Sequence, residues 1–210
     1  MQTLHKCAPD ISVIIPVYNL EKFIQPMLDS LIMQDLGDYT AQIIFVLNNC
    51  TDNSESVIRN SGLLCTIINC TEQGCGPARN LGLDISTGKY IWFMDGDDWL
   101  TEPDAIRAVL DKVLAEDLDV MRIPFDSDKF LWDYFSMVWQ YVLKRDFIKE
   151  FRFPAIQPCE DDLYMNAVLV KAGYSRFNHL NLPHIKRTLY FYNYLREGSN
   201  MYRFSRGERI

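Results

Sequence analysis

Residues 89–100 read KYIWFMDGDDWL, an apolar segment typical of a buried strand that runs directly into a turn with three carboxylates. Carboxylates this close repel one another, which costs free energy unless a cation or several hydrogen-bond donors offset the repulsion. Mg²⁺ and Mn²⁺ prefer carboxylate oxygens, and open α/β sheets bind ligands at the carboxyl ends of their strands. Asp95, Asp97 and Asp98 therefore indicate a site for a divalent metal and a phosphate. The plainer alternative is a solvated acidic turn, since Asp and Gly are common turn residues.

The composition is that of a globular protein with one hydrophobic core. The chain has 210 residues, of which 48% are hydrophobic and 23% charged, and its net charge is −7. This acidic balance disfavours a non-specific nucleic-acid binder, which is usually basic. The sequence contains no apolar run of the length that spans a membrane, and residues 1–10 lack the apolar core of a signal peptide. Six cysteines without a C-x-x-C pair favour reduced thiols, so we expect a cytoplasmic protein.

The spacing of apolar residues predicts strands that alternate with helices up to about residue 125. The expected strands are 12–17, 41–47, 65–69, 90–94 and 119–123. The expected helices are 21–34, 54–59, 77–86 and 103–116. Pro26 lies inside the first of these helices and can mark the start of its regular part. Continuous apolar strands separated by helices imply an α/β fold with a mostly parallel central sheet flanked by helices on both faces.

Two further segments accompany the acidic turn. Residues 11–19 read ISVIIPVYN, and residues 74–82 read GCGPARNLG. These two segments and the acidic turn, in this order and at these separations, resemble the family 2 glycosyltransferases of the GT-A fold. The resemblance extends from about residue 11 to about residue 199. It implies a single catalytic domain over 1–210, with a Rossmann-like nucleotide-binding half at about 11–125 and an acceptor-side half at about 126–210.

The resemblance implies an inverting transfer of a sugar from a nucleoside-diphosphate sugar to an acceptor hydroxyl. A UDP-sugar is the leading candidate for the donor, and a glycan or lipid-linked molecule for the acceptor. Such relatives build surface polysaccharides and glycolipids, which suits a cytoplasmic enzyme that visits the inner face of the membrane. The leaving diphosphate needs a Lewis acid, so Mn²⁺ or Mg²⁺ is the implied cofactor. By the same resemblance Asp97 or Asp98 ligates the metal, without a ranking between them, and Asp95 accepts hydrogen bonds from donor hydroxyls.

The resemblance also assigns a set of residues to the donor. They are Pro16, Tyr18, Asn19, Asn48, Gly76, Arg79, Asp95, Arg196 and Ser199. The first three follow the first strand and are expected against the nucleoside, with a simple strand-ending turn as the alternative. Gly76 is expected to let the backbone approach the donor.

Two of these residues are cations suited to phosphate. Arg79 is expected to face the diphosphate or the acidic turn, and its alternative role is a salt bridge to Asp95 that only holds the fold. Residues 192–199 resemble a loop that closes over the diphosphate in the family. Arg196 has the planar guanidinium that matches phosphate geometry, and Ser199 can donate a hydrogen bond there.

The segment after the second strand departs from the family pattern. Residues 46–52 read VLNNCTD, so Leu47 and Asn48 stand where two acids are usual. The second acid normally accepts a hydrogen bond from the base's imino N–H. Asn48 can accept the same bond through its amide oxygen, although a neutral amide binds more weakly than a carboxylate. This departure leaves the nucleobase and the strength of donor binding open.

An inverting transfer also needs a carboxylate that takes the proton of the acceptor hydroxyl. Residues 159–162 read CEDD and open a helical pattern, and they resemble the Glu-Asp pair of the family. Asp161 is the expected base, and Glu160 is expected to orient it or to bind the acceptor. The alternative is that these acids only stabilise a helix N-terminus.

Residues 125–153 are dense in aromatic side chains and match the acceptor region of the family. Aromatic faces stack on sugar rings, and Trp139 is the expected acceptor contact among them. Most of these aromatic residues are nevertheless expected in the core.

Three other functions compete with an active glycosyltransferase. A non-catalytic nucleotide-sugar or glycan-binding protein on the same fold would explain Leu47 and Asn48, but it has no need of a base such as Asp161. A nucleotidyltransferase needs a basic, Gly-rich signature after the first strand, which this sequence lacks there. A dinucleotide-binding fingerprint fails because Arg79 stands in place of its third glycine.

Overall fold

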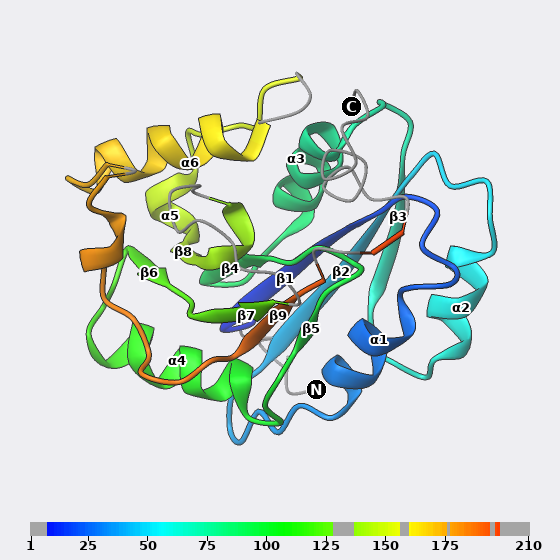
Figure 1. Cartoon of the computed structure of the whole chain (residues 1–210), viewed down its shortest axis with the longest axis horizontal. Helices are drawn as coiled ribbons and strands as arrows, with labels where there is room; N and C mark the ends of the chain where they lie inside the picture. The colour runs from blue at the N-terminus through cyan, green and yellow to red at the C-terminus, as the bar shows by residue number, and fades with distance from the viewer. Residues whose placement is uncertain (1–7, 128–136, 156–159, 176, 194–195, 198–210) are drawn as a thin grey trace, which may run out of the picture.

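The computed structural model describes residues 8–127, 137–155, 160–175, 177–193 and 196–197. Its centre is a six-stranded sheet in the order β3-β2-β1-β4-β8-β6 (Figure 1). The strands are β1 (Ile11–Val17), β2 (Ala41–Asn48), β3 (Thr66–Cys70), β4 (Tyr90–Phe93), β6 (Val120–Arg122) and β8 (Tyr141–Lys144). The first four run parallel, and β8 is antiparallel to both β4 and β6. The mostly parallel sheet predicted from the sequence is therefore confirmed.

Helices cover both faces of this sheet. Successive side chains of a strand point to opposite faces, so an apolar strand such as β1 contributes to a core on each side. On β1, Val13 and Ile15 belong to one core cluster, whereas Ile14 belongs to a second. The first cluster contains side chains of α1 (Gln25–Ile32), α2 (Ser54–Asn60) and α4 (Ala105–Ala115). The second contains side chains of α3 (Cys75–Ile85), α5 (Arg145–Ile148) and α6 (Glu160–Lys171). Figure 1 shows α3, α5 and α6 together on one side of the sheet.

A small second sheet brings the C-terminal part of the chain to the acidic turn. It has the order β5-β9-β7, with β5 at Trp99–Leu100, β9 at Tyr190–Tyr192 and β7 at Phe125–Ser127. Since β5 directly follows Asp98, its pairing with β9 places residues 190–191 beside the turn. Two short 3₁₀ helices, η1 (Val138–Gln140) and η2 (His179–Asn181), complete the described elements.

The expected elements of the first half agree with the structure to within a few residues, the usual scatter of element ends. The first helix begins at Gln25, beside Pro26, as the proline indicated. One placement is corrected. Pro16 lies inside β1, buried and paired with Val46, and not in the loop after the strand. Pro16 is therefore part of the sheet, and its contact with a nucleoside stays a prediction.

Candidate active site

The acidic turn leaves the carboxyl end of β4, where it points its three carboxylates in different directions. The N–H of Asp98 donates to the carbonyl of Asp95 at 3.1 Å and closes the turn. The side chain of Asp95 is 28% exposed and that of Asp97 15%, whereas Asp98 is completely buried. Adjacent acids therefore have different surroundings, which the sequence does not distinguish.

Asp98 is held inside the protein by β9 and the residue after it. Its Oδ2 accepts a hydrogen bond from the hydroxyl of Tyr190 at 2.5 Å, and its Oδ1 accepts from the N–H of Asn193 at 2.9 Å. Burial raises the pKa of Asp98 well above its usual value, and the neighbouring charges of Asp97 and Asp95 add to the effect. With both oxygens directed to β9, Asp98 is poorly placed to ligate a metal, so the geometry favours Asp97.

Asp97 lies at the edge of the site beside Arg196. The Nε of Arg196 donates to Oδ2 of Asp97, and its guanidinium lies 5.0 Å from the centroid of the Phe23 ring. Burial raises the pKa of Asp97, and the positive charge of Arg196 opposes that shift. The structure thus brings the expected phosphate-side cation to the expected metal carboxylate, although more than ninety residues of sequence separate them.

Arg79 is the central cation of the buried part of the site. Its guanidinium is 4% exposed and donates to Asp95 Oδ1 and to Glu160 Oε1, both at 2.9 Å. The guanidinium also lies 5.5 Å from the ring centroid of Phe153. Arg79 therefore connects the acidic turn to the first turn of α6. These ion pairs match the structural role that the sequence left open for Arg79 beside a contact with the diphosphate.

Asp161 follows Glu160 at the start of α6. Burial raises its pKa to about 6, although the positive charge of Arg79 opposes that shift. One of its oxygens accepts the N–H of Asp162 at 3.0 Å. A partly buried carboxylate with a pKa near neutrality has the properties of a general base. Glu160 is buried against Arg79, so it reaches the site only through that ion pair.

The loops after β1 and β2 are joined by reciprocal hydrogen bonds. Oδ1 of Asn19 accepts the N–H of Thr51 at 2.8 Å, while Asn19 Nδ2 donates to the hydroxyl of Thr51 at 3.2 Å. Asp52 accepts the N–H of Glu21 at 2.9 Å. Tyr18, beside these bonds, is 60% exposed. The paired loops therefore present one free aromatic side chain at the carboxyl edge of the sheet.

Asn48 has a structural role at the end of β2. Its Nδ2 donates to the carbonyl of Glu72 at 2.5 Å, and its Oδ1 accepts the N–H of Gly74 at 2.9 Å. Both ends of the buried amide are thus bonded to the loop before α3, while one N–H and one lone pair of the amide remain, so the nucleobase contact stays a prediction. Gly74 has a φ of 117°, a conformation that glycine adopts readily and other residues rarely do, so the loop that Asn48 holds requires this glycine. An aspartate at this position could not donate to Glu72.

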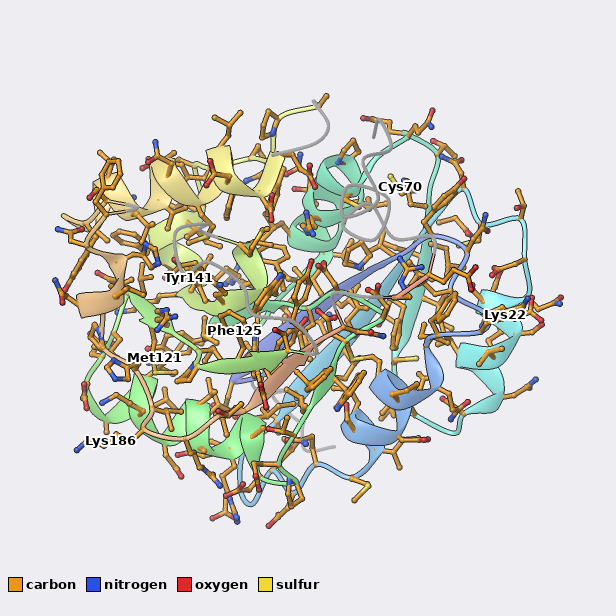
Figure 2. All side chains as sticks on the ribbon, in the orientation of Figure 1. Lys22, Cys70, Met121, Phe125, Tyr141 and Lys186 are labelled. Atoms are coloured by element: carbon orange, nitrogen blue, oxygen red, sulfur yellow. The ribbon has the colours of Figure 1, made fainter. Side chains whose placement is uncertain are left out.

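Packing corrects the expectation for Trp139 and gives Gly76 a structural role. Trp139 is 1% exposed and stacks on Tyr190 and Tyr192, with centroid distances of 5.0 and 4.7 Å, while Phe125 (labelled in Figure 2) meets it edge-on. It is a core residue in this structure and offers no free face to an acceptor. A Cβ at Gly76 would lie 2.7 Å from the carbonyl of residue 154, so this glycine serves the approach of α3 to that segment.

Ser199 lies outside the described residues. The contributions of Tyr190 and Asn193 were not predicted. The only signal for Tyr190 in the sequence is the run of three aromatic residues at 190–192 (YFY), which is typical of a strand but indicates no partner.

The described residues include no group of three or more His, Cys, Asp or Glu side chains arranged to hold a metal ion. Mg²⁺ at nucleotide sites is commonly bound by one or two carboxylates together with the phosphates of the substrate. Asp97, with Asp95 beside it, supplies hard oxygen ligands of that kind. The side chains present therefore fit a metal that is shared with a diphosphate.

A family model described as glycosyl transferase family 2 matches residues 12–177. The chain belongs to this family. Among curated relatives, glycosyltransferase GlyA of Streptococcus pneumoniae is 34% identical over 52% of the chain and 16% of its own length. The processive diacylglycerol beta-glycosyltransferase of Mycoplasma genitalium is 28% identical over 67% of the chain and 39% of its own length. The chain thus spans well under half the length of these two family members.

Solved structures of two glycosyltransferases share the fold. Staphylococcus aureus TarS in complex with UDP-GlcNAc superposes with a TM-score of 0.80 at 21% identity, over 92% of the chain and 60% of TarS. The mannosyltransferase PcManGT from Pyrobaculum calidifontis, in complex with GDP-Man and Mn²⁺, gives 0.69 at 17% identity, over 96% and 61%. These likenesses establish the GT-A fold that the sequence resemblance implied. In the described part of the chain, no helix is both long and apolar enough to cross a bilayer.

Proposed function

We propose that this member of the family is an inverting glycosyltransferase that uses a nucleoside-diphosphate sugar, a UDP-sugar first of all. The acceptor is a hydroxyl of a glycan or lipid-linked molecule in surface polysaccharide or glycolipid synthesis. One observation carries the proposal: Arg79 bridges Asp95 of the acidic turn and Glu160 of α6. That bridge keeps the donor-side acids next to Asp161, a carboxylate whose raised pKa of about 6 suits a base.

The donor nucleoside is placed against the paired loops after β1 and β2. Tyr18 is the exposed aromatic side chain that can stack on a nucleobase. Arg196 is the mostly buried cation beside the acidic turn, and its guanidinium suits the diphosphate. The similar structures of TarS with UDP-GlcNAc and of PcManGT with GDP-Man support a nucleotide-sugar donor.

Asp97, assisted by Asp95, would hold Mn²⁺ or Mg²⁺. When bound, the metal supplies Lewis acidity that stabilises the negative charge on the departing nucleoside diphosphate. Arg196 lies against the same carboxylate and adds a second positive charge for that leaving group. Arg79 is already neutralised by two carboxylates, so its role is to hold Asp95 and Glu160 in place.

Asp161 takes the proton of the acceptor hydroxyl. The acceptor oxygen then forms the new bond to the anomeric carbon from the face opposite the diphosphate, whose bond to that carbon breaks, so the configuration inverts. Since the pKa of Asp161 is about 6, its basic form predominates above that pH. A higher carboxylate pKa also makes a stronger base, which suits proton abstraction near neutral pH.

Release of UDP from UDP-sugars with Mn²⁺, with and without a glycan acceptor, tests this proposal. Wild-type protein should turn over, Asp161→Asn should lose about 10²- to 10⁴-fold in kcat, and both should bind UDP equally. Asp162→Asn is the matched control, since it removes the next acid of the same helical turn. Donor binding without any turnover would instead favour a non-catalytic protein on this fold, which the Leu47–Asn48 departure also suggests.

A further inference from the structure

The hydroxyl of Tyr190 and the carboxylate of Asp98 form a buried pair that joins β9 to the acidic turn. The proposed chemistry gives this pair no role. The hydroxyl of Tyr190 donates to Asp98 Oδ2 at 2.5 Å and accepts the backbone N–H of Asp95 at 3.1 Å. Tyr190 and Asp98 are both fully buried. One oxygen atom of β9 therefore bonds to the first residue of the turn and to its last carboxylate.

The residue after β9 makes a second pair of bonds to the same turn. The N–H of Asn193 donates to Asp98 Oδ1 at 2.9 Å, and Asn193 Nδ2 donates to the backbone carbonyl of Asp97 at 3.2 Å. The carbonyl of Asn193 in turn accepts the N–H of Arg196 at 3.4 Å. A series of hydrogen bonds thus connects Asp98 through Asn193 to Arg196, whose guanidinium contacts Asp97.

The direction of the Asp98 side chain matters for its role. A buried carboxylate is costly unless hydrogen bonds satisfy it, and here the donors to both oxygens come from β9 and Asn193. A metal ligand would instead keep some access to the open site, and the side chain of Asp97 is still 15% exposed. Substitution of side chains that orient the ligands of a metal commonly weakens metal binding by about 10- to 100-fold.

We propose that Asp98 is a positioning residue and not a metal ligand. Through Tyr190 and Asn193 it holds the backbone of the acidic turn, so that Asp97 faces the metal and Arg196 stays beside it. The proposal deepens the proposed function, on which it rests, because it assigns the two acids that the sequence leaves unranked.

Tyr190→Phe isolates this interaction. The Tyr190 ring stacks on Trp139 at 5.0 Å and tilts against Trp92 at 6.3 Å, and phenylalanine keeps both contacts. Only the hydroxyl that joins Asp98 to Asp95 is lost. The matched control is Tyr90→Phe, which removes an equally buried hydroxyl that donates to the carbonyl of Val113 at 2.9 Å, at the other end of β4.

Mn²⁺ affinity in the presence of UDP, measured by electron paramagnetic resonance, tests the proposal. Tyr190→Phe and Asp98→Asn should each weaken Mn²⁺ binding about 10- to 100-fold, and the double variant should be little worse than either single one. Asp97→Asn should abolish binding, and Tyr90→Phe should leave it unchanged. The proposal is overturned if Asp98→Asn abolishes binding while Tyr190→Phe and Tyr90→Phe behave alike.

A second readout does not depend on the proposed function. If wild-type protein binds no Mn²⁺ with any nucleotide, the metal-dependent function fails, and amide hydrogen exchange still tests the role of Asp98. The N–H groups of Asp95 and Asn193 should exchange about tenfold faster in Tyr190→Phe and Asp98→Asn than in wild type or Tyr90→Phe. Unchanged exchange at both amides would overturn the positioning role.

Discussion

The two sides of the candidate site are held together by different forces. On the nucleoside side, the loops after β1 and β2 are joined by exposed hydrogen bonds such as that between Asn19 and Thr51. On the acidic side, buried charges make the contacts: Arg79 pairs with Asp95 and Glu160. Exposed polar bonds contribute little each, whereas a buried charge without its partner is strongly destabilising. The donor rim should therefore tolerate substitution, and the acidic side should not.

Arg79→Ala should produce the largest effect. It leaves Asp95 and Glu160 without their shared counter-charge, so we expect a loss of about 3–5 kcal/mol in the free energy of unfolding. Denaturant titration measures it. The control is Arg107→Ala, which breaks a half-exposed ion pair with Asp35 at 2.9 Å and should cost below about 1 kcal/mol. Equal losses for the two variants would contradict the greater contribution of the buried ion pairs on the acidic side.

The buried charge of Asp161 should lower the stability of the folded protein above about pH 6. Because burial raises the pKa of its folded form to about 6, above the ordinary 3.8, the native state binds this proton more tightly than the unfolded state. The free energy of unfolding therefore falls as pH rises from about 4 to about 6. Asp161→Asn should be more stable than wild type at pH 8 and similar to it at pH 4. Activity of the wild type should fall below about pH 6 as the base becomes protonated.

Thermal unfolding at the two pH values measures the stability difference, and a pH–rate profile of the wild type measures the activity. Asp111→Asn provides a control, because this exposed acid bonds only the hydroxyl of Tyr39 among the contacts described. A wild-type activity that stays level down to pH 4 would exclude Asp161 as the base.

Tyr18→Ala should affect binding without affecting the fold. A stacked base is worth about 1–3 kcal/mol, so UDP affinity should fall roughly 5- to 150-fold, while Tyr18→Trp should retain it. Because Tyr18 is 60% exposed, the unfolding midpoint without ligand should be unchanged. Isothermal titration calorimetry measures the affinity. An unchanged affinity for Tyr18→Ala would move the nucleobase away from this loop.

Asn19→Gly should have the smallest effect. It removes the side-chain bonds to Thr51 but keeps a residue suited to the φ of 51° found there. We expect a loss of about 1 kcal/mol or less in the free energy of unfolding. Asn19→Ala should cost more, because alanine disfavours that conformation. A loss for Asn19→Gly as large as that for Arg79→Ala would remove the distinction between the two sides.

Local patterns predict the first half of the fold well. Strands β1 to β4 are continuous apolar runs, and the helices between them have their own periodicity, so each element is encoded within a short window of sequence. The acidic turn and the acids at the start of α6 are likewise visible as segments, and the structure brings them together through Arg79.

The rest depends on contacts between distant residues. Asp97 and Asp98 are neighbours in a turn, which has no periodicity to reveal that one is partly exposed and the other is buried against β9. The pairing of β9 with β5 joins residues about ninety positions apart, so no local pattern indicates Tyr190. Trp139 shows the same limit, since an aromatic ring suits a core as well as a sugar-binding surface.

The central claim is that Asp97 binds a nucleoside diphosphate through a divalent metal. Its most direct test is the thermal unfolding midpoint of the protein with UDP, GDP, CDP or dTDP, with and without Mn²⁺, for wild type and Asp97→Ala. A ligand that binds only the native state raises its stability. The account predicts that one diphosphate, UDP first of all, raises the wild-type midpoint only with Mn²⁺ and has no effect on Asp97→Ala. A metal-dependent shift that persists in Asp97→Ala, or no shift with any diphosphate, would contradict it.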